Sequence, residues 1–227
     1  PVRLPVANAS TAVAAAAIGV VGICRRPWAR RVIGVVTMIA ALLAGALGVN
    51  AGYGVTHNLA AILGVQALDP ASLPPSESSS GDPATLYQRW EPPAGMPAQG
   101  SVSALTGSTK IPTGQYAARD ASLYLPPAAQ VPDPPALPLL VFMMGQPGSP
   151  DPTALAKALD AFAAKNKGLA PIAIVVDQLS APDRDPACAD SATFGAVSTY
   201  INQLVPQWAE KNLNIIKDAK YRVIGGF

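Results

Sequence analysis

Apolar and polar residues are distributed unevenly along the chain, and two apolar runs near the N-terminus stand apart from the rest. Residues 6–24 are mostly alanine, valine, isoleucine and glycine, and residues 32–49 contain no charged side chain. A run of about 18 apolar residues approaches the length that crosses the hydrocarbon core of a bilayer. Between the two runs, residues 25–31 contain four arginines and a tryptophan. Because arginine-rich loops stay in the cytoplasm, we predict a transmembrane helical hairpin whose 25–31 loop is cytoplasmic.

A signal peptide is the competing interpretation of the first run, but such a peptide carries its positive charge before the apolar stretch and not after it. Residues 50–68 are semi-apolar and predict an interfacial segment where the second span leaves the membrane, so the residues after about 50 are expected to be extracytoplasmic. His57 is the single histidine of the sequence, and a polar position at the interface explains it better than catalysis. Residues 1–68 therefore form the first predicted domain.

Residues 69–107 are rich in proline, serine and glycine, which is the composition of an extended linker. Residues 108–227 form the third predicted domain. Strand patterns occupy residues 100–111, which overlap the end of the linker, and residues 121–125, 137–144, 172–176 and 221–224, and helical patterns occupy residues 152–165 and 194–211. Buried strands that alternate with helices predict a parallel sheet of the α/β class. Pro206 lies within the second helical pattern and predicts an interruption of that helix.

The composition also favours a membrane segment, because half of the residues are apolar and only 13% are charged, whereas about a quarter are charged in a typical soluble domain. The net charge of +2 is small, and the sequence has no basic patch with interleaved aromatic residues, so nucleic acid is not an expected partner. Cys24 and Cys188 are the two cysteines. They fall on opposite sides of the predicted membrane, and we do not expect them to pair.

Candidate chemistry lies where the predicted strands end, because ligands of parallel α/β sheets bind at the carboxyl ends of the strands. The first such end is Gly145-Gln146-Pro147-Gly148. Glycine lets the backbone turn sharply and approach a substrate, so that a peptide N–H can donate to a developing oxyanion. Pro147 has no N–H, which leaves the backbone N–H of Gln146 as the predicted donor.

The last strand end, Gly225-Gly226-Phe227, matches the first half of a nucleophile elbow. In that motif a strained turn of the pattern small-x-Ser-x-small raises a serine above the sheet. Gly226 and Phe227 form the first two positions, so we expect the nucleophilic serine to follow Phe227.

Polar residues near the other strand ends have plainer explanations. Asp177 ends the second buried strand, and we interpret it as a cap of the following loop rather than a site residue. That loop carries four charged residues, Asp183, Arg184, Asp185 and Asp190. They fit a solvated loop better than a cation or head-group site, because clustered carboxylates alone do not specify a metal. Cys188 has no suitable histidine nearby, which favours a disulfide to a cysteine after Phe227, or a buried free thiol, over a nucleophile. We expect neither a cofactor nor a metal.

Four segments share their pattern with a known family: residues 119–127, 137–150, 185–191 and 224–227. They resemble the actinobacterial membrane-anchored esterases, a group related to esterase D and to the secreted mycolyltransferases. The resemblance covers residues 100–227 and implies the front half of an α/β-hydrolase sheet. It also implies a Ser-Asp/Glu-His triad, whose members follow one another in that order, so all three are expected after Phe227. The family's His-Gly is Met144-Gly145 here, which keeps the backbone donor but removes one supporting side chain.

The resemblance and the predicted anchor together imply a membrane-anchored extracytoplasmic serine esterase or acyltransferase that acts on acyl esters of the cell envelope. Its expected partners are the lipid bilayer, an acyl-lipid or envelope-glycan substrate and other membrane proteins. The alternative is a non-catalytic accessory or scaffold subunit of an envelope membrane complex, which the small residues of the apolar runs and Met144 favour. A third hypothesis is a module that binds envelope glycan or lipid and lacks the triad.

Overall fold

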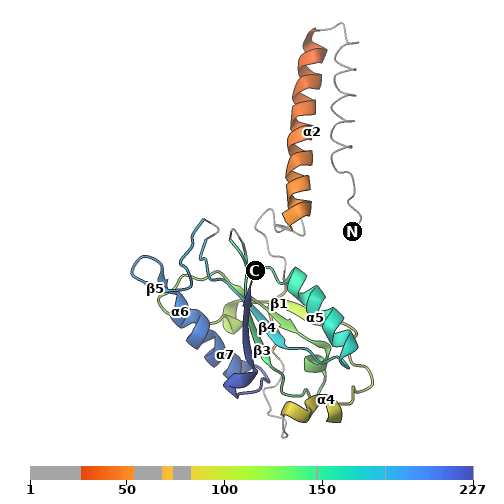
Figure 1. The fold of residues 1–227 in the computed structure, drawn as a ribbon, viewed down its shortest axis with the longest axis vertical. Coiled ribbons are helices and arrows are strands. Elements are labelled where there is room, and N and C mark those ends of the chain that lie inside the picture. Colours follow the sequence, from red (N-terminus) through yellow and green to blue (C-terminus); the bar gives the residue numbers. More distant parts are fainter. Residues whose placement is uncertain (1–26, 54–67, 74–82, 147, 182, 227) are drawn as a thin grey trace. The chain divides into compact units, whose positions relative to one another are not determined.

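The structure is a computed structural model that describes residues 27–53, 68–73, 83–146, 148–181 and 183–226. Its contacts divide the chain into two units, Pro1–Leu59 and Ala60–Phe227. The first unit contains helix α2, and the second contains a central sheet with helices on both sides (Figure 1). The second unit is therefore of mixed α/β class, as the sequence predicts.

Helix α2 spans Pro27–Tyr53, and its Pro27–Gly45 portion is long and apolar enough to cross a membrane. The helix starts earlier than predicted, because Pro27 and Arg31 are helical and do not belong to a loop. Proline is favoured at the first helical position, where its missing N–H has no partner in any case. The first apolar run, residues 6–24, and the interfacial residues around His57 lie outside the described residues, so the hairpin and its orientation stay predictions.

Five strands form the central sheet in the order β1-β2-β4-β3-β7 (Figure 1). They are β1 Ser101–Leu105, β2 Ala121–Leu125, β3 Leu139–Met143, β4 Ile172–Val176 and β7 Arg222–Gly226. Strands β4, β3 and β7 are parallel, which agrees with the predicted alternation of strand and helix. Strand β2 runs antiparallel to both of its neighbours, β1 and β4.

Strand β1 lies inside residues 69–107, the predicted linker, at the strand pattern of residues 100–111. Ala104 of β1 is buried, so this stretch contributes to the folded unit. The backbone before it also contacts the sheet, because the Ala71 N–H donates to the Ala104 carbonyl (2.9 Å) and the Ala104 N–H donates to the Asp69 carbonyl (2.8 Å). The proline-rich composition does not predict these contacts, because backbone groups make them and they depend little on side chains.

Helices cover both faces of the sheet, in keeping with the alternation of side chains along a strand. Helix α5, Thr153–Lys165, packs on the face that presents Tyr124 and Ala173. The opposite face presents Ile172, Ile174 and Val176. It is covered by α6 Val197–Thr199, a π-helical turn at Tyr200–Leu204, and α7 Val205–Asn212.

The interruption predicted at Pro206 is confirmed, and it takes the form of the π-helical turn that precedes α7. Proline cannot donate a backbone hydrogen bond, so the helical hydrogen-bond pattern shifts around it. The predicted helix over residues 194–211 nevertheless begins too early. Gly195–Ala196 forms strand β6, which pairs with β5, Asp190–Ser191, and Gly195 has a φ of +83° that a right-handed helix does not accommodate.

Strand β7 is an edge strand and not the buried strand that its apolar residues predicted. The residue exposures of Val223 and Ile224 are 51% and 53%, because β7 pairs with β3 on one side and has no neighbour on the other among the described residues. Its glycines allow a close approach to β3. A Cβ atom on Gly226 would lie 3.0 Å from the carbonyl oxygen of Met143, tighter than side chains normally tolerate.

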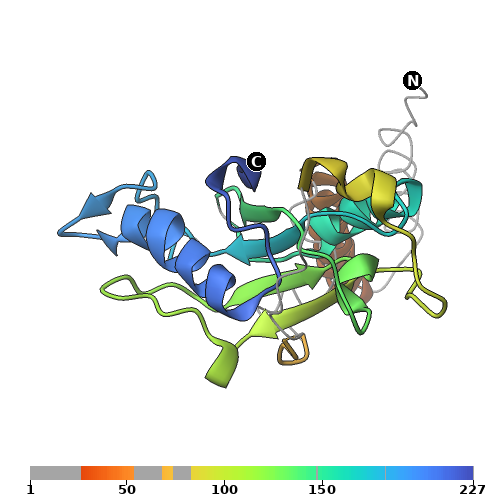
Figure 2. The same ribbon diagram turned by 90° about the horizontal axis from the view of Figure 1, so that it is seen from below.

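Short helices complete the unit: the 3₁₀ turns Pro83–Thr85, Gly107–Thr109, Pro127–Gln130 and Ala219–Tyr221, and helix α4, Leu86–Arg89. Helix α4 is yellow in Figure 2 and contacts the loop that follows α5. The Trp90 indole N–H donates to the Lys167 carbonyl (3.0 Å), and the Lys167 ammonium donates to the carbonyls of Tyr87 and Trp90 (both 3.2 Å). These contacts join α4 to the loop that follows α5.

Candidate functional site

A cleft of about 290 Å³ lies at the carboxyl ends of β3, β4 and β7. Gly145, Gln146 and Gly226, three of the four predicted site residues, line it. They meet there because the parallel register places the ends of the three strands level with one another, with Met143 paired to Val176 on one side and to Gly226 on the other. Phe227 lies outside the described residues.

The loop between β3 and α5 turns so tightly that it requires glycine. A Cβ atom on Gly148 would lie 2.1 Å from the carbonyl oxygen of Gly145, so this oxygen faces Gly148. A trans peptide is planar and its C=O and N–H point in opposite directions. The Gln146 N–H, which belongs to the same peptide as the Gly145 carbonyl, therefore points away from Gly148, and it donates to no acceptor among the described residues.

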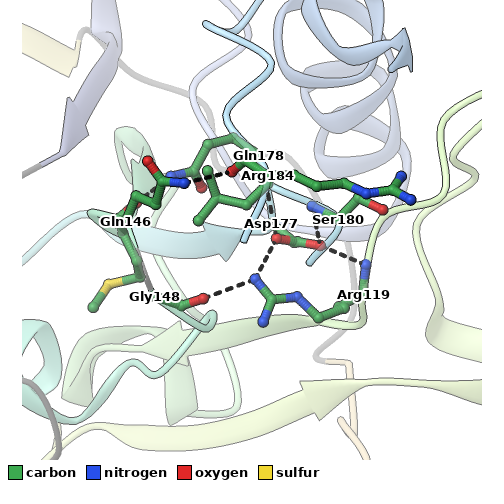
Figure 3. A network of polar contacts seen from close by, with 9 residues as sticks. Arg119, Gln146, Gly148, Asp177, Gln178, Ser180 and Arg184 are labelled. Carbon is green, nitrogen blue, oxygen red and sulfur yellow. Dashed lines mark hydrogen bonds and ion pairs between the residues drawn. The ribbon is translucent and has the colours of Figure 1, made fainter. Parts of the chain in front are cut away.

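Two side chains near the start of β2, those of Arg119 and Ser122, bind the C-terminal part of this β3–α5 loop. The Arg119 guanidinium Nη2 donates to the Gly148 carbonyl (2.9 Å), as Figure 3 shows. The Ser122 hydroxyl, which is fully buried, donates to the Pro150 carbonyl (2.8 Å). Both contacts satisfy backbone carbonyls of the loop.

The N-terminal part of the loop is held by side chains from the segment after β4. The Gln178 amide donates to the Met144 carbonyl, and the Gln146 amide donates to the Arg184 carbonyl (3.2 Å). The backbone of the loop is thus fixed on both sides of the Gln146 N–H (Figure 3).

Asp177 caps the loop after β4, as the sequence predicts. Its carboxylate accepts hydrogen bonds from the backbone N–H groups of Leu179 and Ser180 (both 3.1 Å). It also forms an ion pair with Arg119, with an Nη2–Oδ1 distance of 2.7 Å, and accepts the Arg119 backbone N–H (2.7 Å). Burial by itself raises the pKa of Asp177, but the hydrogen bonds and charge of Arg119 outweigh burial and hold this pKa below its usual value.

Arg119 is the residue that sequence reasoning missed. It lies 58 positions before Asp177 and 29 before Gly148, and no local spacing connects the three. The available signal is indirect: Arg119 precedes a strand that runs antiparallel to β4, which brings it to the same edge of the sheet as the ends of the parallel strands.

Cys188 lies at the cleft as an exposed thiol, which corrects the expectation of a buried one, whereas the disulfide to a cysteine after Phe227 stays a prediction. Its Sγ is 3.8 Å from the Met143 Sδ. Partial burial and the negative charge of Asp185 raise the pKa of the thiol, so it is protonated at neutral pH and poorly nucleophilic. The neighbouring loop is exposed, as expected, and the described residues contain no cluster of three metal-ligating side chains.

No family model matches the chain. The chain is 36% identical over 126 residues to an uncharacterized protein of Corynebacterium glutamicum, and the match covers 54% of this chain and 29% of that protein. The chain thus spans less than a third of the length of this relative. Among solved structures, a ferulic acid esterase is 17% identical with a TM-score of 0.43, over 59% of this chain and 50% of that one. At these levels neither comparison assigns an activity.

Proposed function

We propose that the chain is part of a membrane-anchored extracytoplasmic serine esterase or acyltransferase that acts on acyl esters of the cell envelope. The observation that carries this proposal is the meeting of Gly145, Gln146 and Gly226 at one cleft. An oxyanion donor and the strand that presents a nucleophile must lie side by side to act on the same carbonyl group.

The sheet supports a hydrolase-type fold. In the α/β-hydrolase fold one oxyanion donor comes from the loop between the third strand and the first helix, which corresponds here to the β3–α5 loop. The strand order β1-β2-β4-β3-β7, with β2 antiparallel, is also the order in which the first strands of that fold are arranged. Strand β7 then takes the place of the strand that leads into the nucleophile elbow.

The proposed reaction begins when the serine after Phe227, deprotonated by the triad histidine, attacks the ester carbonyl carbon. The carbonyl oxygen becomes an oxyanion, which accepts hydrogen bonds from the Gln146 N–H and from the N–H after the serine. The intermediate expels the alcohol, which receives the proton from the histidine, and leaves an acyl-enzyme. Water then completes hydrolysis, or an acceptor alcohol completes acyl transfer. One such donor contributes a factor of about 10²–10³ in rate.

The substitution of the family histidine by Met144 is the main argument for the accessory or scaffold alternative. The loop contacts weaken that argument, because the Gln178 amide binds the Met144 carbonyl and Arg119 binds the Gly148 carbonyl. The support that the family histidine gives to this loop is therefore supplied by other side chains.

A fluorophosphonate probe tests the proposed activity on a protein that includes the residues after Phe227. We expect covalent labelling of the residue that directly follows Phe227, and loss of labelling when that residue is changed to alanine. The 227-residue chain alone is the matched control and is expected to remain unlabelled. Absence of labelling, or a residue other than serine after Phe227, would favour the scaffold alternative.

The proposed location is testable through Cys188, because its thiol is exposed. A membrane-impermeant maleimide, applied to intact cells at mildly alkaline pH, is expected to label the protein, and Cys188→Ser is expected to abolish that labelling. Labelling that requires cell lysis would place this unit in the cytoplasm and contradict the proposed topology.

A further inference from the structure

The carboxylate of Asp177 joins two segments that are far apart in the sequence. Its side chain is fully buried and accepts four N–H groups: the Arg119 backbone N–H and Nη2 (both 2.7 Å) and the backbone N–H groups of Leu179 and Ser180 (both 3.1 Å). An ionised carboxylate with this many donors has little freedom to rotate. The position of the Arg119 guanidinium is therefore set by Asp177.

Arg119 extends this connection to a third segment. Its Nη2 atom, which binds Asp177 Oδ1, also donates to the Gly148 carbonyl (2.9 Å) (Figure 3). A guanidinium is planar and Nη2 carries two hydrogens in fixed directions, so one hydrogen bond orients the other. The neighbour of Asp177, Gln178, binds the Met144 carbonyl at the other end of the loop.

In the sequence, Gln146 lies between Met144 and Gly148, the residues whose carbonyls bind Gln178 and Arg119. We infer that Asp177 and Arg119 are positioning residues, which touch no reacting atom and hold the β3–α5 loop so that the Gln146 N–H faces the developing oxyanion. This inference rests on the proposed esterase or acyltransferase function. It follows from geometry, because a misplacement of about 1 Å in a preorganised site lowers the rate by as much as about 100-fold.

The test uses the whole protein, including the residues after Phe227, with Arg119→Gln and Arg119→Lys. The matched control is Lys110→Gln, which removes the ion pair between Lys110 and Asp120, the residue that follows Arg119. Its two side chains are 2.8 Å apart and about half exposed. kcat and KM are measured with p-nitrophenyl butyrate, and kcat is expressed per active site titrated with fluorophosphonate. Unfolded protein does not react with the probe, so a loss of folded protein leaves this kcat unchanged.

We expect Arg119→Gln to lower kcat per titrated site by about 10- to 100-fold with little change in KM, since an oxyanion contact acts in the transition state. Arg119→Lys keeps a cation beside Asp177 and is expected to recover part of the loss. Lys110→Gln is expected to remain within twofold of the unaltered protein. A kcat per titrated site for Arg119→Gln within twofold of the unaltered protein would overturn the inference.

A protein that neither reacts with the probe nor hydrolyses the ester would refute the proposed function, and the positioning role is then decided by hydrogen exchange. Arg119→Gln is expected to speed the exchange of the backbone amides of Gly145, Gln146 and Gly148 at least tenfold, whereas Lys110→Gln leaves it unchanged. Equal exchange in the two variants would overturn the inference independently of any activity.

Discussion

The guanidinium of Arg119 lies 2.7 Å from the carboxylate of Asp177, and the side chain of Asp177 is fully buried while that of Arg119 is 29% exposed. Burial raises the pKa of Asp177, and the hydrogen bonds and charge of Arg119 lower it further than burial raises it. The folded protein therefore holds the ionised carboxylate more strongly than the unfolded chain does, and this preference makes the stability of the fold depend on pH.

The Arg119–Asp177 pair predicts a loss of stability in acid. Because the pKa of Asp177 is lower in the folded state than its value of about 3.9 in the unfolded chain, the stabilisation is complete above about pH 4 and is lost as the pH falls through the folded pKa. Thermal unfolding in detergent micelles between pH 7 and pH 3, followed by tryptophan fluorescence, measures this. Asp177→Asn is expected to remove that part of the acid dependence.

The reciprocal change weakens this acid dependence. Arg119→Met leaves a buried carboxylate without its cation, which costs about 3 kcal/mol of unfolding free energy at pH 7. The pKa of Asp177 rises when the guanidinium is lost, although backbone N–H groups still bind the carboxylate, so this variant is expected to lose less stability than the unaltered protein as the pH falls below about 4. The same acid dependence in Arg119→Met as in the unaltered protein would contradict the assignment.

Gly148→Ala is expected to disrupt the β3–α5 loop, because its Cβ would lie 2.1 Å from the Gly145 carbonyl oxygen, a backbone atom that cannot move aside alone. We expect kcat/KM for p-nitrophenyl butyrate to fall about 100-fold, the contribution of one oxyanion donor. Gly95→Ala is the control: Gly95 has a φ of +84° but open space around it, so its cost is conformational strain of about 1 kcal/mol. Equal loss of activity in both variants would refute the steric explanation.

The strands were predictable where burial alone determines them. The run Ile172–Val176 is buried along its whole length, and its uninterrupted apolar pattern identified it with the correct bounds. The strand Ser101–Leu105 has a mixed small and polar composition within a proline-rich stretch, and its place in the sheet comes from backbone pairing with β2. The strand pattern of residues 100–111 indicated this strand, but local composition does not specify its partner in the sheet.

The candidate site was predictable in part for a similar reason. Gly145 follows β3 and Gly226 ends β7, and the carboxyl ends of parallel strands share one edge of the sheet, so their meeting follows from the strand assignment. Arg119 precedes β2, and its arrival at that edge requires β2 to be antiparallel to β4. The pattern of strands and helices does not specify the direction of β2. The contacts of Arg119 with Asp177 therefore could not be predicted from the sequence.

Two buried tyrosines, Tyr116 and Tyr124, are expected to differ in how loss of the hydroxyl group changes the stability of the fold. The Tyr116 hydroxyl has no hydrogen-bond partner among the described residues, whereas the Tyr124 hydroxyl donates to Asp160 Oδ1 (2.8 Å). Tyr124→Phe is expected to cost about 1.5–2 kcal/mol, the usual effect of a hydrogen bond to a charged group. Tyr116→Phe is expected to be neutral or to stabilise by up to about 1 kcal/mol, because it removes a buried polar group without a partner.

The comparison is made by thermal unfolding of the two variants at pH 7, where both phenols are neutral, since the ordinary pKa of tyrosine is about 10 and burial raises the pKa values of these two further. A loss for Tyr116→Phe as large as that for Tyr124→Phe would contradict the assignment of the Tyr116 hydroxyl as a group without a hydrogen-bond partner.

From the negative charge of Asp185 we predict that the cleft discriminates between substrates by charge. Among the described residues that line the cleft, it is the one with a formally charged side chain, and its carboxylate is kept in place by the Ala187 backbone N–H (3.0 Å). An anionic group bound within about 4 Å of this carboxylate is disfavoured by about 1 kcal/mol in a water-like dielectric, a factor of about five. We therefore expect p-nitrophenyl butyrate to be a better substrate than the p-nitrophenyl monoester of succinate.

Asp185→Asn is expected to raise kcat/KM for the anionic succinate ester about fivefold while leaving that for the neutral butyrate ester unchanged. Asp183→Asn is the matched control, because Asp183 lies in the same exposed loop and does not line the cleft. Added salt screens exposed charges, so it is expected to narrow the difference between the two esters in the unaltered protein and to have little effect in Asp185→Asn. An equal response of the two variants would assign the selectivity to the overall charge of the loop and refute a specific role of Asp185.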